Sequence, residues 1–87
     1  MLDMHRMNIW KRQEVEKIIE KAVDEKLKFI ENGGIPTRIE ISEYAYNILR
    51  DYNKSLGYYK ENNIHETLIG LKVIVDAKKS YNHVKIL

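Results

Sequence analysis

The sequence predicts an α+β fold, in which a long N-terminal helix covers a small mixed sheet of about three strands in the order α-β-α-β-β. Apolar residues recur every three or four positions up to residue 32, and they alternate with polar residues after Pro36. That is the change from the helical period to the strand period. The chain has 87 residues, which suits one domain, so we expect residues 1–87 to form a single domain.

The first element is predicted to be a helix over residues 9–32. Asn8 is a suitable N-cap, and Gly33 supplies a left-handed C-cap before Pro36 prevents further helix. The apolar positions of this helix lie three or four residues apart, and they are Val15, Ile18, Ile19, Ala22, Val23, Leu27 and Ile30. Residues 1–8 are expected to be flexible or to form part of an oligomer interface.

The next two elements are a strand and a second helix. Residues 37–41 alternate between polar and apolar, which places Ile39 and Ile41 on the core side. Ser42 then caps a helix over residues 43–56, because a serine hydroxyl satisfies a free backbone amide of the first turn. The buried stripe of this helix is predicted to be Ala45, Ile48, Leu49, Tyr52 and Leu56.

Two further strands are predicted over residues 71–75 and 83–87. The first of these runs is β-branched and almost entirely apolar, which is typical of the central strand of a sheet. Because a helix joins them, the strands at 37–41 and 71–75 are expected to be parallel. The last two strands are expected to form a hairpin.

The composition excludes several classes of protein. The chain has no cysteine, which excludes disulfides and thiolate metal sites and favours a reducing compartment, the cytoplasm. No apolar run approaches the ~18 residues that a membrane-spanning helix needs. The net charge is +2, from 15 basic and 13 acidic residues, and this is too small to indicate a nucleic-acid-binding protein by itself.

No catalytic or cofactor-binding motif stands out in the sequence. Gly33 and Gly34 follow a helix and precede a strand, which is the reverse of the order in a phosphate-binding loop. The three histidines, His5, His65 and His83, do not have the helical spacing of metal ligands. We therefore expect no enzymatic activity, no cofactor and no metal site.

Tyrosine is the most unusual feature, since six occur in 87 residues. Exposed tyrosines give a recognition surface a large contact area, but a thin core also uses half-buried tyrosines as filler, and both interpretations stay open. Basic turn residues likewise suit either phosphate contact or plain solvation. The candidate partner-binding residues are Arg38, Tyr58, Tyr59, Lys60, Lys78, Lys79 and Tyr81.

A homodimer or higher homo-oligomer is also expected, because the first helix is long for so small a domain. Met4, Met7 and Trp10 extend beyond its regular apolar stripe. Methionine and tryptophan are enriched at protein interfaces, so these three residues are the predicted oligomer interface.

The stretch over residues 35–87 carries a resemblance to known sequences. It runs from Ile-Pro-Thr-Arg-Ile-Glu-Ile-Ser through a tyrosine-rich helix to Leu68-Ile69-Gly70-Leu71 and then Val73-Ile74-Val75-Asp76. This stretch resembles a segment of tailed-phage major capsid proteins, and also small uncharacterised phage and prophage proteins of low-GC Gram-positive bacteria. The resemblance implies a phage origin more than it implies a particular function.

These observations lead to the expectation of a non-enzymatic phage-type accessory protein that binds and neutralises a host component in the bacterial cytosol. The expected partner is a host defence protein or a small anionic nucleotide-like ligand, and no membrane partner is expected. One alternative is a nucleic-acid-binding regulator that uses the basic C-terminal hairpin, where four lysines outnumber Asp76. Another alternative is a minor structural or assembly protein of the virion.

Overall fold

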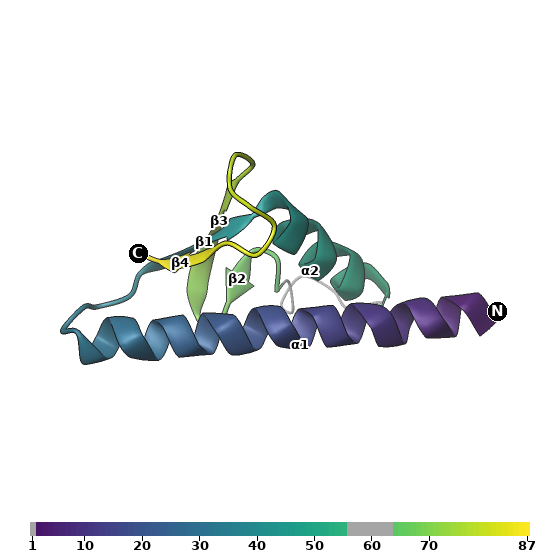
Figure 1. The fold of residues 1–87 in the computed structure, drawn as a ribbon, viewed down its shortest axis with the longest axis horizontal. Coiled ribbons are helices and arrows are strands. Elements are labelled where there is room, and N and C mark those ends of the chain that lie inside the picture. Colours follow the sequence, from purple (N-terminus) through teal and green to yellow (C-terminus); the bar gives the residue numbers. More distant parts are fainter. Residues whose placement is uncertain (1, 56–63) are drawn as a thin grey trace.

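A computed structural model gives a two-layer α+β fold, as the sequence predicts (Figure 1). It describes the backbone of residues 2–55 and 64–87, and the side chains of residues 12–54 and 64–87. Helix α1 spans Leu2–Glu31 and helix α2 spans Glu43–Ser55. Both helices contribute to one apolar core on a single face of the sheet.

The sheet has four strands, which lie in the order β2-β3-β1-β4. Their bounds are Arg38–Ser42 for β1, Thr67–Leu68 for β2, Leu71–Asp76 for β3 and Val84–Ile86 for β4. β1 and β3 are parallel, as predicted, and the other two pairings are antiparallel, so the sheet is mixed.

The predicted hairpin between the last two strands is wrong, because β4 pairs with the far edge of β1 and not with β3. The segment after Asp76 is long enough to carry the chain across the end of β1. In this position Val84 and Ile86 lie beside Ile41 and Ile39 and are buried in the core under α1. The gain in apolar burial explains why this pairing replaces the hairpin.

β1 and β3 are the two inner strands of the sheet, which confirms the run at 71–75 as a central strand. Each has a hydrogen-bonded strand on both sides, and in β1 the side chains of Ile39 and Ile41 are fully buried. β2 is two residues long and covers the first part of β3. As a consequence Val75, near the end of β3, is partly exposed.

The strand that the sequence prediction missed, β2, joins β3 through a two-residue turn at Ile69 and Gly70. Both residues have positive φ, 47° and 80°, as a type I′ hairpin turn requires. A β-branched residue rarely takes this conformation. Ile69 is held in it because its side chain packs against the core and its carbonyl accepts a hydrogen bond from Lys26 Nζ at 2.9 Å.

Helix α1 begins earlier than predicted and ends as predicted. It already includes residues 2–8, so Asn8 lies within the helix and is not its N-cap. At the other end Gly33 has a φ of 87°, its amide bonds the Ile30 carbonyl and the Gly34 amide bonds the Phe29 carbonyl, which is a Schellman cap. Among the described helices, none is both long and apolar enough to cross a membrane.

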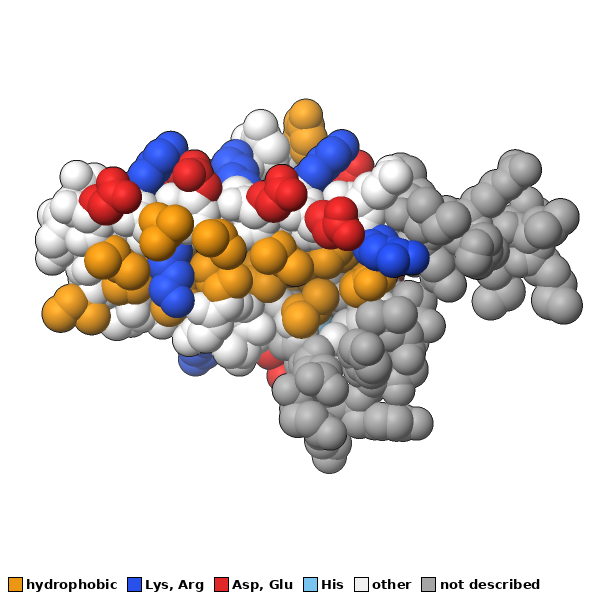
Figure 2. Space-filling model, turned by 90° about the horizontal axis from the view of Figure 1, so that it is seen from below, with side chains coloured by type: hydrophobic (Ala, Val, Ile, Leu, Met, Phe, Trp, Pro, Cys, Tyr) orange, Lys and Arg blue, Asp and Glu red, His pale blue; other side chains and the backbone are white. Residues whose placement is uncertain are grey.

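The apolar residues of α1 divide into two faces. Val15 and Ala22 are buried against the sheet and α2, and Phe29 packs beside them. Ile19 is half-buried, and three further residues of the predicted stripe point outward, with Val23 41%, Leu27 54% and Ile30 47% exposed. We call Ile19, Val23, Leu27 and Ile30 the outer stripe, and Figure 2 shows an apolar band along this side of the molecule.

Two isoleucines on neighbouring strands test this layered arrangement. Ile41→Ala should lower the free energy of unfolding by about 2–4 kcal/mol, because it leaves a cavity in the centre of the core. Ile74→Ala, from the half-buried opposite face, should lower it by clearly less. Urea unfolding of both variants measures the difference, and equal losses would contradict the assignment of the inner face.

Candidate partner-binding site

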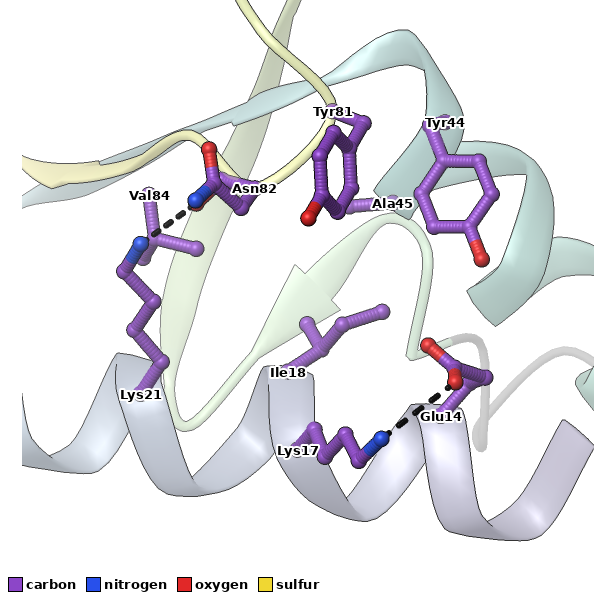
Figure 3. A pocket seen from close by; sticks show the side chains of 9 residues that line it. All are labelled: Glu14, Lys17, Ile18, Lys21, Tyr44, Ala45, Tyr81, Asn82 and Val84. Atoms are coloured by element: carbon purple, nitrogen blue, oxygen red, sulfur yellow. Dashed lines mark hydrogen bonds and ion pairs between the residues drawn. The ribbon is translucent and has the colours of Figure 1, made fainter.

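A small hollow lies where α1, the start of α2 and the turn before β4 meet (Figure 3). Its volume is about 130 Å³. The residues that line it come from three separate stretches of the chain, and they are Glu14, Lys17, Ile18, Lys21, Tyr44, Ala45, Tyr81, Asn82 and Val84. We call it the tyrosine pocket.

The tyrosine pocket has an apolar base and aromatic walls. Ala45 and Val84 belong to the core, and Ile18 packs against that core from α1. The Tyr44 and Tyr81 rings meet edge to face, with 5.8 Å between centroids and 88° between planes. Tyr81 is 69% exposed, so a partner reaches its ring without any rearrangement of the core.

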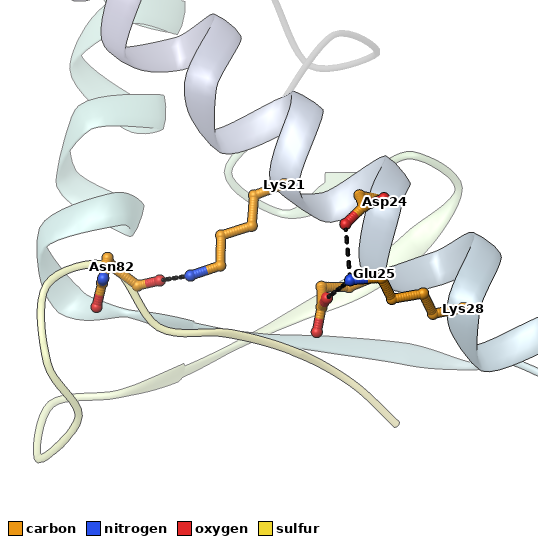
Figure 4. A network of polar contacts seen from close by, with 5 residues as sticks. All are labelled: Lys21, Asp24, Glu25, Lys28 and Asn82. Atoms are coloured by element: carbon orange, nitrogen blue, oxygen red, sulfur yellow. Dashed lines mark hydrogen bonds and ion pairs between the residues drawn. The ribbon is translucent and has the colours of Figure 1, made fainter.

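The charged groups at the rim are already engaged within the chain. Lys17 Nζ lies 3.6 Å from Glu14 Oε1, and Lys21 Nζ donates a hydrogen bond to the Asn82 carbonyl at 2.5 Å. Figure 3 shows both contacts beside the pocket, and Figure 4 shows the Lys21–Asn82 contact again. The rim therefore offers a partner two paired lysines rather than a pair of open cation sites.

Glu14 also acts on Tyr44. Burial, followed by the negative charge of the Glu14 carboxylate and its hydrogen bond with the phenol, raises the pKa of the Tyr44 hydroxyl above its ordinary value. A phenol is protonated at physiological pH even at its ordinary pKa, and this shift keeps the Tyr44 hydroxyl a hydrogen-bond donor to higher pH.

A single buried serine holds the pocket together. Ser42 Oγ accepts a hydrogen bond from the Ala45 amide at 3.0 Å, which confirms it as the N-cap of α2. The same hydroxyl donates to the Tyr81 carbonyl at 2.6 Å. Ser42 thereby ties the end of β1, the first turn of α2 and the backbone under the Tyr81 ring to one another.

The turn that carries Tyr81 has its own internal hydrogen bonds. The Lys78 amide bonds Asp76 Oδ1 at 3.0 Å, and the Lys79 amide bonds the Asp76 carbonyl at 3.3 Å. The His83 amide bonds the Ser80 carbonyl at 3.0 Å. These contacts at both ends fix the turn as a support for the pocket wall.

The sequence-predicted site residues fall in three places. Tyr81 lines the pocket, and Lys78 and Lys79 are exposed on the same turn but outside the lining. Arg38 lies at the other end of β1, beside Lys72 and about 13 Å from Ser42 along the strand. The other candidates lie outside the residues or side chains that the structure describes, and they are Tyr58, Tyr59, Lys60, Met4, Met7 and Trp10.

Sequence reasoning missed the partners of Tyr81 in this pocket. The position of Tyr44 off the apolar stripe of α2 was a signal that its ring is not part of the core. Its contact with Tyr81, 37 positions away in the chain, could not be predicted from that signal. Lys21 and Asn82 are 61 positions apart and meet through a backbone carbonyl, which no sequence pattern encodes.

Comparison with known proteins adds no identification. No protein-family model, no curated protein and no solved structure matches the chain. Within the described ranges, no group of three or more histidine, aspartate or glutamate side chains is arranged to hold a metal ion.

Ser42 can be tested against a second serine of the same region. Ser42→Ala should lower the free energy of unfolding by about 1–3 kcal/mol, because it removes a helix cap and leaves the Tyr81 carbonyl without its donor. Ser80→Ala, which removes an exposed hydroxyl that bonds the Asn82 side chain, should change it by about 0.5 kcal/mol or less. Thermal and urea unfolding compare the two, and a neutral Ser42→Ala would contradict the role assigned to this hydroxyl.

Proposed function

We propose that the protein is a non-catalytic binding protein whose partner is another protein. The observation that supports this is the tyrosine pocket, which has an apolar base beside two tyrosine rings in contact with each other. Interfaces of this kind use a pocket to receive one large side chain of the partner, and the surrounding tyrosines supply contact area at small entropic cost. A partner would thus insert one apolar or aromatic side chain beside the touching Tyr44 and Tyr81 rings, over the apolar base of the pocket.

The size of the pocket favours a protein over a nucleotide-like ligand. Pockets for drug-sized or cofactor-sized molecules measure about 300 to 1,000 Å³, whereas this one measures about 130 Å³. A single side chain fits that volume, but a base, a ribose and a phosphate together do not.

The charged groups at the rim also favour a protein partner over a nucleotide-like ligand. Phosphate recognition relies on cations and amides that are free to point at the ligand. Lys17 is paired with Glu14, and Lys21 is bonded to the Asn82 carbonyl. An anionic ligand would first have to break these contacts. It would then lie close to the Glu14 carboxylate, which has the same sign of charge.

A phage-type accessory protein that neutralises a host protein in the bacterial cytosol is the biological setting we propose for such a site. Neutralisation requires occupation of a surface and no chemical step. This setting rests on the resemblance of residues 35–87 to phage sequences, and the pocket supplies the means of binding.

Affinity capture from bacterial lysate tests the proposal. The wild-type protein should enrich a particular protein, and Tyr81→Ala should reduce its recovery by about thirtyfold or more, because Tyr81 is an exposed aromatic anchor. Lys79→Ala is the matched control, since it changes an exposed residue of the same turn outside the pocket. Quantitative mass spectrometry of the eluates measures the ratios.

Two outcomes of that experiment would contradict the proposal. One is equal recovery of the partner with wild type and Tyr81→Ala. The other is the absence of an enriched protein, combined with a rise in melting temperature on addition of nucleotides or cyclic dinucleotides. The second result would restore the nucleotide-sequestering hypothesis.

A second candidate function, nucleic-acid binding, is favoured by the open face of the sheet. Arg38 and Lys72 are register partners on this face, and Lys85 lies opposite Glu40. The three cations are exposed, although the Glu40 carboxylate is also hydrogen-bonded to His83, with 2.9 Å between Oε1 and Nε2. Since β3 and β4 do not pair, these residues replace the predicted basic hairpin as the surface for phosphate contact.

Salt dependence of DNA and RNA binding tests this second candidate. If it holds, affinity should fall with a logarithmic slope of about −0.9 per phosphate contact, and Lys72→Gln should weaken binding and reduce that slope by about one. Lys54→Gln, an exposed lysine of α2, is the control. Fluorescence anisotropy with labelled oligonucleotides measures both, and a lack of binding at low salt would remove this candidate.

A further inference from the structure

The outer stripe of α1 is a second surface on the opposite side of the helix from the tyrosine pocket. Its four residues, spaced by four, four and three positions, fall on one face of a helix with 3.6 residues per turn. Three of them keep between 41% and 54% of their surface exposed. A contiguous apolar band of this kind marks an interaction surface.

One edge of the outer stripe carries charged side chains of both signs, as Figure 2 shows. At 100° per residue, all members of this edge lie between about 60° and 140° from Val23 around the helix axis. They are exposed, and they are Lys17, Glu20, Asp24, Lys28 and Glu31. We call this set the charged edge.

We propose that the outer stripe is covered by a second copy of this chain, with the two α1 helices antiparallel and a two-fold axis beside Asp24. A two-fold of this orientation brings the charged edge of one helix against the charged edge of the other. A residue of one helix then lies at the same height along the pair as the partner's residue for which the two numbers add up to about 48. Glu20 meets the partner's Lys28, and Lys17 meets the partner's Glu31, each contact occurring twice.

The same alignment matches the apolar residues to one another. Ile19 lies opposite the partner's Ile30, and Val23 lies between the partner's Val23 and the partner's Leu27. Around the axis Asp24 approaches its own copy, but each Asp24 is already paired with Lys28 at 3.1 Å within its chain (Figure 4). The charge on the axis is therefore offset locally.

A parallel arrangement of the two helices lacks this complementarity. It would turn the charged edge toward the other flank of the partner's stripe, where Lys26 lies. Lys26 Nζ is held in a part-buried hydrogen bond to the Ile69 carbonyl at 2.9 Å, whereas the side chains of Lys17 and Lys28 are 73% and 63% exposed and pair with acids of their own helix. Exposed pairs of that kind contribute little, so Lys17 and Lys28 can turn to a partner's carboxylate and Lys26 cannot. The antiparallel pair is also clear of the tyrosine pocket, apart from Lys17, which borders both surfaces.

The outer stripe contributes only four apolar residues from each chain, so we expect a contact at the lower end of the size range of specific interfaces. We therefore expect a dimer with a dissociation constant in the micromolar range. This interface lies in the C-terminal half of α1, and so it differs from the one predicted at Met4, Met7 and Trp10.

Sedimentation equilibrium of the full chain from low micromolar to millimolar concentration tests the proposal. The wild-type protein should change from monomer to dimer across this range. Leu27→Glu should remain monomeric throughout, because it places a carboxylate in the centre of the apolar contact. Ile35→Glu is the matched control, since Ile35 is 84% exposed and lies beyond the helix, and it should dimerise like wild type.

Charge reversal tests the orientation of the pair. Glu20→Lys should raise the dissociation constant by about tenfold, since each reversal changes two symmetry-related contacts. Lys28→Glu should have a similar effect, and the double variant should return to within a few-fold of wild type. Circular dichroism checks that each variant keeps its helical content.

The outcomes that overturn the proposal are specific. A wild-type protein that stays monomeric at millimolar concentration overturns the second copy as the occupant. A dimer that survives Leu27→Glu places the contact elsewhere. A double variant that dimerises more weakly than either single variant overturns the antiparallel alignment.

Discussion

The Ser42 hydroxyl is the contact on which the candidate site depends. Ser42 is buried at the end of β1, where its hydroxyl accepts a hydrogen bond from the Ala45 amide and donates one to the Tyr81 carbonyl. Each of these groups would otherwise lack a partner at a helix start or in a turn, where a lost hydrogen bond is costly. Because one hydroxyl bonds both the Ala45 amide and the Tyr81 carbonyl, it fixes α2 and the backbone of Tyr81 relative to each other. The tyrosine pocket forms where these two segments meet α1.

The length of α1 imposes the second constraint. A helix of 30 residues is about 45 Å long, and the small sheet and α2 cover one face of it. The apolar arc of α1 is wider than that face, so Val15 and Ala22 are buried while Val23 and Leu27 remain outside. The excess is the basis of both proposals, since the inner side of the helix supports the tyrosine pocket and the outer side is the proposed contact with a second copy.

Local signals predicted the elements, and tertiary contacts decided their arrangement. The cap at Ser42, the inward Ile39 and Ile41, and the helix end at Gly33 follow from residue type and spacing, and the structure confirms them. The strand β2 was missed because its turn uses Ile69 in a conformation that normally indicates glycine or asparagine. Strand pairing and the tyrosine pocket depend on contacts between residues far apart in the chain, which spacing cannot reveal.

Chemical-shift mapping of the ¹⁵N-labelled protein tests the central claim, that the tyrosine pocket accepts a single apolar side chain, most directly. The probes are N-acetyl-phenylalanine amide and adenosine monophosphate at equal millimolar concentration. The account predicts that the amino-acid probe shifts the amides of Tyr44, Ala45, Asn82 and Val84, and that the nucleotide leaves them unchanged. Shifts of these amides by the nucleotide alone, or shifts by the amino-acid probe confined to the open face around Lys72 and Lys85, would contradict it.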